Sequence, residues 1–163
     1  MNEPYITELC REASRIQEDS IHSAKGHYNT ADRWNKIHLW IGIPNAVLAA
    51  IAGLSAFNDE TLIAGSLAVS VAAITAITTF LNPGDRSSTH KRCAGEYLSL
   101  RNKSRIFENI TSKHCKSEEE LTSRFEEMIN KRDDLNATSP QIPEWAFNKA
   151  RKGIEEGEST YKT

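Results

Sequence analysis

Apolar residues gather in two long runs near the middle of the chain, with a short polar turn between them. The first run covers Ile37–Phe57 and the second covers Leu62–Leu81, and neither contains Asp, Glu, Lys or Arg. Each run is about 20 residues long, or roughly 30 Å as a helix, which matches the hydrocarbon core of a bilayer. Only residues 58–61 connect them, and so short a connection makes antiparallel neighbours. The pattern predicts a transmembrane helical hairpin over residues 37–81, with spans at 37–57 and 62–81.

The same pattern would suit two buried central helices of a soluble bundle, because a helix that is apolar on all sides is buried in either a protein core or a membrane. We favour the membrane because the other segments are too polar to surround both helices. The turn carries Asp59 and Glu60, whereas basic residues flank both outer ends of the hairpin, at Lys25, Arg33, Lys36, Arg86, Lys91, Arg92 and Arg101. The positive-inside rule then predicts that both termini are cytoplasmic.

Residues 1–36 predict a long cytoplasmic amphipathic helix, with no obvious helix breaker before the first span. Its apolar and small residues recur at spacings of three and four, which is typical of one helix face packing on a partner. The stripe comprises Leu9, Ala13, Ile16, Ser20, Ala24, His27, Ala31 and Trp34.

Residues 82–152 predict further cytoplasmic helices, and residues 153–163 a flexible tail. Asn82-Pro83-Gly84 ends the second span, and Ser117 with Glu120 forms a capping box. The helix before Ser117 is basic and the helix after it acidic, which favours an antiparallel pair of complementary charge. Several large residues of the basic helix fall near one side: Tyr97, Leu98, Ile106, Phe107 and Ile110. The whole pattern predicts an all-α membrane protein with a cytoplasmic C-terminal helical bundle.

Small residues line one face of each span when the helices are drawn at about 100° per residue. Such faces let helix backbones approach closely in lipid, so they are predicted to pack either within the hairpin or between chains. They are Gly42, Ala46, Ala49, Ala50 and Gly53 in the first span, and Gly65, Ala72, Ala76 and Thr79 in the second.

A few polar residues in the spans make pore lining an alternative role for the two helices. Asn45 is the one amide of the first span, and Ser66 and Ser70 share a face of the second, so these three are candidate pore-facing residues. Thr75 points nearly opposite to the serines, so the hydroxyls do not form a single polar stripe. Neither span carries a charge, which argues against a proton relay or an ion-coupling site.

Six basic residues and one acid, Glu96, lie between Arg86 and Arg105. The run has three explanations: topology together with pairing to the acidic helix, contact with anionic headgroups, or recognition of a phosphate-bearing ligand. The first candidates for the ligand are Arg101, Lys103 and Arg105.

The length, charge, cysteine count and motifs of the chain limit the functions that it can have. The chain has 163 residues, a net charge of −2 and three widely spaced cysteines. This length indicates one domain or one hairpin with arms, and the cysteines indicate a reducing compartment. No phosphate-binding loop, dinucleotide fingerprint, catalytic triad or metalloprotease motif occurs. We therefore expect no enzymatic activity, no metal or other cofactor, and no DNA or RNA binding.

Two motifs and the order of the elements carry a resemblance to a known family. The motifs are Gly42-Ile43-Pro44 and Phe80-Leu81-Asn82-Pro83, and a Tyr-x-x-Leu-Arg pattern follows at Tyr97, Leu100 and Arg101. Over roughly residues 13–135 the chain resembles the SLATT family, the two-transmembrane effector domains of bacterial conflict systems. The resemblance implies a membrane effector of antiphage defence in the bacterial inner membrane, associated with nucleotide-second-messenger synthetases or nucleotide sensors.

We therefore expect a non-enzymatic effector that oligomerises and permeabilises or depolarises the inner membrane. The expected partners are membrane lipid, further copies of the chain, and either a cyclic nucleotide or a nucleotide-synthetase or sensor protein that controls it. The alternative is a membrane-anchored scaffold that recruits a partner through its cytoplasmic helices.

Overall fold

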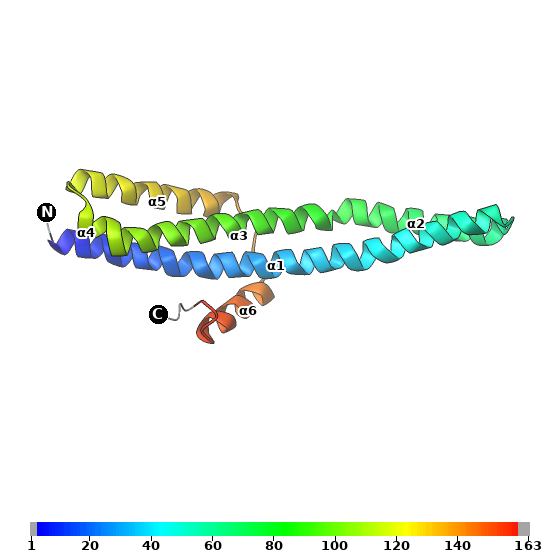
Figure 1. Ribbon diagram of the computed structural model, residues 1–163, viewed down its shortest axis with the longest axis horizontal. Coiled ribbons are helices and arrows are strands. Elements are labelled where there is room, and N and C mark those ends of the chain that lie inside the picture. Colours follow the sequence, from blue (N-terminus) through cyan, green and yellow to red (C-terminus); the bar gives the residue numbers. More distant parts are fainter. Residues whose placement is uncertain (1–2, 160–163) are drawn as a thin grey trace. The chain divides into compact units, whose positions relative to one another are not determined.

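The computed structural model describes residues 3–159, which form helices joined by short connections, with no strand in that range (Figure 1). This confirms the all-α fold. Residues 160–163 of the predicted tail lie outside the described residues. The elements are α1 (Glu3–Phe57), α2 (Thr61–Leu81), α3 (Pro83–Ile106), a π-helical segment η1 (Phe107–Thr111), α4 (Ser112–His114), α5 (Glu118–Thr138) and α6 (Glu144–Glu155).

The chain divides into two compact units. Residues 31–88 form one, which we call the hairpin unit, and the flanking segments up to Thr30 and from Thr89 onward form the other, the helical unit. α1 is a single helix across the segment where the sequence shows no breaker, as expected.

In the hairpin unit, two left-handed residues mark the ends of the helices. Asp59 has a φ of 59° in the turn after α1. Asn82 ends α2 with φ 44° and ψ 56°, and its N–H donates to the Thr78 carbonyl at 2.9 Å. Asparagine tolerates this conformation better than most residues, and the proline that follows is common just beyond a helix end. The Asn-Pro stop thus acts as the sequence predicts.

The two hairpin helices meet along a seam in which three- and four-residue spacings alternate, as in coiled coils. The seam positions are the less exposed ones: Ile41, Asn45, Leu48, Ala52 and Ser55 in α1, and Ala64, Leu67, Val71, Ile74 and Thr78 in α2. Outside the seam the surface is exposed and apolar, with large side chains such as Ile43, Val47 and Val69. Because α2 buries none of its residues, it differs from the core helix of a soluble protein.

The helical unit holds the hydrophobic core. α3 runs antiparallel to α1, and α5 runs back along α3 (Figure 1). The ring centroids of Phe107 in η1 and Phe125 in α5 lie 5.7 Å apart in the core. The predicted α1 stripe is buried from Leu9 to Ala31, which confirms the packing face of this helix. The core cluster comprises Leu9, Ala13, Ile16, Ala24, Tyr97, Leu100, Phe107, Leu121, Phe125, Met128 and Leu135.

Only some of the large residues that fall near one side of α3 and η1 are buried. Ile106 and Ile110 are 46% and 54% exposed. The buried stripe is Cys93, Tyr97, Leu100, Ser104 and Phe107, which advances by four and three residues in turn. Both isoleucines fall one position before members of this repeat or its continuation, so their side chains point about 100° away from the core.

Two features of the C-terminal helices follow from local sequence. Ser117 caps α5, since its Oγ accepts from the Glu120 N–H at 3.1 Å. The Glu120 carboxylate instead accepts from Arg124 at 2.8 Å, so the second half of the predicted capping box is absent. α6 packs on α1 through Ala146 and Ala150, which are buried, and the Asn29 side chain donates to the Ala146 carbonyl at 3.2 Å.

Candidate functional site

The small-residue faces of both spans point away from the hairpin seam. All nine predicted packing residues are exposed, and a Cβ built on Gly42, Gly53 or Gly65 would meet nothing within 4 Å. The small faces therefore do not meet within the hairpin, which was one of the two alternatives. Contact between chains remains the prediction for these residues: Gly42, Ala46, Ala49, Ala50, Gly53, Gly65, Ala72, Ala76 and Thr79.

Asn45 lies on the seam rather than on an outer face. Its Nδ2 donates to the Thr75 Oγ1 at 3.0 Å, while its Oδ1 is buried without a hydrogen-bond partner. Interhelical hydrogen bonds of this kind stabilise membrane helix pairs by about 0.6–2 kcal/mol. In the single hairpin, Asn45 thus joins the two helices and sets their register.

The two serines proposed to face a pore are exposed but bonded to their own helix. Ser66 donates to the Ile63 carbonyl and Ser70 to the Ser66 carbonyl, both at 3.0 Å. Hydroxyls that bond back in this way leave no unsatisfied donor on a lipid-facing surface. Their place on a pore stays a prediction.

The base of the hairpin combines an aromatic ring with a basic side chain. The Arg86 guanidinium lies 5.1 Å from the centre of the Trp34 ring, and its Nε donates to the Leu81 carbonyl at 2.8 Å. A cation at this end of α2 is favoured by the helix dipole. Trp40 is 79% exposed. An exposed tryptophan near such a cation–π pair is typical of a membrane–water interface.

The three proposed phosphate ligands have different surroundings. Arg101 is partly buried, and its Nη2 donates to the Ser159 carbonyl at 3.3 Å. Lys103 instead lines a cavity of about 250 Å³ beside the π-helical segment, together with Arg124 and Phe107. Arg105 is exposed. A π-helical turn often accompanies functional sites, and joint binding of a phosphate by these three cations stays a prediction.

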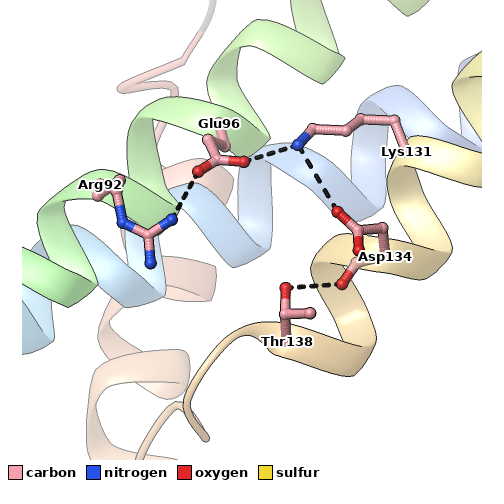
Figure 2. A network of polar contacts seen from close by, with 5 residues as sticks. All are labelled: Arg92, Glu96, Lys131, Asp134 and Thr138. Carbon is pink, nitrogen blue, oxygen red and sulfur yellow. Dashed lines mark hydrogen bonds and ion pairs between the residues drawn. The ribbon is translucent and has the colours of Figure 1, made fainter.

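An ion-pair network joins α3 to α5 (Figure 2). The Glu96 carboxylate accepts from Lys131 at 2.7 Å and from Arg92 at 3.0 Å, and Lys131 also lies 3.8 Å from Asp134. The Lys131 hydrogen bond lowers the pKa of Glu96, and Glu96 in turn raises the pKa of Lys131. The sequence predicted that basic residues of α3 pair with acidic residues of α5. In this pair the charges are reversed, because α3 supplies the acid, Glu96, and α5 supplies the base, Lys131.

Two histidines that the sequence did not single out as a pair are buried together in the helical unit. The Nδ1 atoms of His27 and His90 lie 2.8 Å apart, so one nitrogen donates and the other accepts. The His27 ring also stacks on Tyr97, whose hydroxyl donates to the Asn136 Oδ1 at 2.9 Å. Burial lowers the pKa of His27 to about 4, with a smaller contribution from His90. Only the spacing in the α1 stripe hinted that His27 is buried.

The described residues contain no group of three or more His, Cys, Asp or Glu side chains that could hold a metal ion.

The fold defines the class of the protein as an all-α protein with a helical unit and a hairpin whose two helices are long and apolar enough to cross a bilayer, which is compatible with a two-span membrane hairpin. The model of one family, described as "SMODS and SLOG-associating 2TM effector domain family 4", matches residues 13–163. The chain belongs to this family of two-transmembrane effector domains, as the resemblance predicted. No curated protein and no solved structure matches the chain.

Proposed function

We propose that the protein is a non-enzymatic effector of a bacterial antiphage system, which oligomerises in the inner membrane and permeabilises or depolarises it. The observation that carries the proposal is the outward position of the small faces on both spans. Membership of an effector family supports the same role.

Packing between chains is the step that the geometry favours. Without a hydrophobic driving force between helices in lipid, association depends on close van der Waals contact, which small residues permit. Because the hairpin already closes through its seam, the small faces can serve other copies of the chain without opening the hairpin.

The proposed topology is multi-pass with both termini in the cytoplasm. The Trp34–Arg86 pair lies at the base of the hairpin, while Asp59 and Glu60 occupy its turn. Positively charged flanks stay on the cytoplasmic side, so the helical unit would meet a nucleotide second messenger or a partner protein there. A cue that binds one arrangement of the helices more tightly than another would shift the population towards it.

The test uses two neighbouring alanines of α2. Both Ala72 and Ala73 are exposed, but successive residues lie about 100° apart on a helix, so only Ala72 belongs to the small face. The chain is expressed in bacteria, with its cognate neighbouring genes and phage where it is silent alone, and membrane potential is followed with a dye. Ala72→Leu should abolish depolarisation, while the same change at Ala73 should preserve it.

Equal effects of the two substitutions would refute packing through the small face. Absence of depolarisation under every condition, with the protein present in the membrane, would instead favour the alternative role of a membrane-anchored scaffold.

A further inference from the structure

A basic cavity lies between α1 and α6 in the helical unit. Its volume is about 410 Å³, and its lining includes Lys25 and Tyr28 of α1 together with Lys149 and Lys152 of α6. Pockets that bind small molecules start at roughly this size. The cavity does not include Arg101, Lys103 or Arg105, so it is separate from the phosphate site that the sequence suggested.

A carboxylate of the same chain sits in this cavity. The Glu158 Oε2 lies 2.5 Å from the Lys25 Nζ. This hydrogen bond, with a further contribution from Lys149, lowers the pKa of Glu158. Lys25 is the more buried partner, with 22% of its side chain exposed against 63% for Glu158. The exposed Glu158 carboxylate is therefore paired with a lysine that is mostly shielded from solvent.

The turn after α6 holds Glu158 in place. Gly157 has a φ of 86°, which favours glycine, and the Glu158 N–H donates to the Gly153 carbonyl at 3.0 Å. A Cβ on Gly153 would lie 2.8 Å from the Glu158 Cδ. A glycine costs about 1 kcal/mol relative to alanine inside a helix, and at this position it leaves room for the carboxylate.

The charge balance of the cavity lining changes by one carboxylate when this contact opens. With Glu158 in place, the lining has three lysines and two glutamates; without it, three lysines and Glu156 remain. Lysine binds phosphate as a mobile point charge, and the Tyr28 ring, which is 41% exposed, offers a flat face next to the cations. This combination suits an organic phosphate better than an inorganic ion alone.

We propose that the cavity formed by Lys25, Lys149, Lys152 and Tyr28 binds a small phosphate-bearing ligand, and that Glu158 is a built-in competitor for it. Ligand binding displaces the Glu158 carboxylate from Lys25. The adjoining Ser159 carbonyl accepts from Arg101 of α3, so a displaced turn also loosens a contact to the next helix. This inference names the site for the ligand control in the proposed function and rests on that function for its biological meaning.

The experiment measures binding by the full chain in detergent micelles with two soluble probes. ATP represents a free nucleotide, and glycerol phosphate represents a lipid headgroup. Glu158→Gln removes the competing charge. An exposed ion pair contributes up to about fivefold in an equilibrium constant, so this variant should bind both probes up to about fivefold more tightly than the unmodified chain.

Charge removal at the cavity should have the opposite effect. Lys149→Ala with Lys152→Ala should weaken binding by about tenfold, given up to about fivefold for each charge contact. The matched control removes two exposed lysines elsewhere, Lys113 and Lys116, and should leave affinity nearly unchanged. Tyr28→Leu should weaken ATP more than glycerol phosphate if the ligand is a nucleotide, and both equally if it is a headgroup.

Two results would overturn the inference: no binding of either probe to the Glu158→Gln variant at millimolar concentration, or equal losses in the cavity and control double variants. Failure of the proposed function gives a different pattern. ATP binding that depends on Lys149 and Lys152, in a chain that never depolarises a membrane, would keep the site and refute the effector role.

Discussion

Acid should destabilise the helical unit through one buried histidine. His27 is 1% exposed, and its pKa is lowered from 6.5 to about 4. Between these two values the unfolded chain binds a proton that the folded chain does not, so the free energy of unfolding decreases as pH falls through this window. The contribution of His27 to the free energy of unfolding is complete above about pH 6.5 and is lost progressively towards pH 4.

The magnitude follows from linkage. One pH unit corresponds to about 1.4 kcal/mol, so the complete shift is worth about 3 kcal/mol, and the part lost between pH 8 and pH 5 about 2 kcal/mol. The contact with His90 gives the same direction. The Nδ1 atoms of His27 and His90 are 2.8 Å apart and can share one proton. Protonation of both rings would place two N–H donors against each other.

The assay compares urea unfolding of the full chain in detergent at pH 8 and pH 5, with a probe in the helical unit. His27→Asn retains a polar side chain but cannot titrate, so it should lose about 2 kcal/mol less than the unmodified chain over this interval. His114 is exposed on α4, and His114→Asn serves as the matched control. If the unmodified chain and His27→Asn show equal pH dependence, the histidine does not carry the effect.

Two further predictions concern the helical unit. Leu121 is completely buried in the core cluster, so Leu121→Ala should lower the free energy of unfolding by about 3 kcal/mol, whereas Ile110→Ala, at a position that is 54% exposed, should lower it by well under 1 kcal/mol; similar losses in urea unfolding would contradict the assigned core. The Glu96–Lys131 pair is partly exposed, at 31% and 41% of the two side chains, so its coupling in a double-mutant cycle with Gln and Met should be no more than about 1 kcal/mol, and a coupling of several kcal/mol would show that the network is far better shielded from water than its exposure indicates.

Hydropathy alone predicted the hairpin because a bilayer imposes a fixed length on an uncharged helix. The end of the hairpin was also predictable from local sequence, because Asn82 and Pro83 stop α2 through backbone conformation and a missing N–H donor. The α1 stripe was predicted because a burial period of three and four residues is visible without knowledge of the partner. These elements depend on local chemistry and therefore appear in the sequence.

The sequence did not reveal which apolar face of each span meets the other. Both the seam and the small faces are uncharged, so hydropathy does not distinguish Leu67 or Val71 on the seam from Ala72 on the outer face. The charge counts of α3 and α5 did not predict the ion pair between these helices for a related reason. The net charge of a helix does not say which residues face its neighbour, and Glu96 and Lys131 meet although each is a minority charge on its own helix. The His27–His90 contact joins residues 63 positions apart, a separation that no spacing rule covers.

The separation of seam and small face also decides how the membrane experiment can be interpreted. Had the small faces closed the hairpin, a bulky residue there would unfold the hairpin, and loss of activity would say nothing about oligomers. Because Ile74 and Thr78 face the partner helix while Ala72 is exposed, Ala72→Leu adds volume only outside the hairpin. A matched break of the seam is available in Asn45→Leu, which removes the hydrogen bond to Thr75 and should weaken the hairpin by about 0.6–2 kcal/mol. If Ala72→Leu abolishes depolarisation while cross-linking across the Asn45–Thr75 seam remains intact, the lost contact must lie between chains.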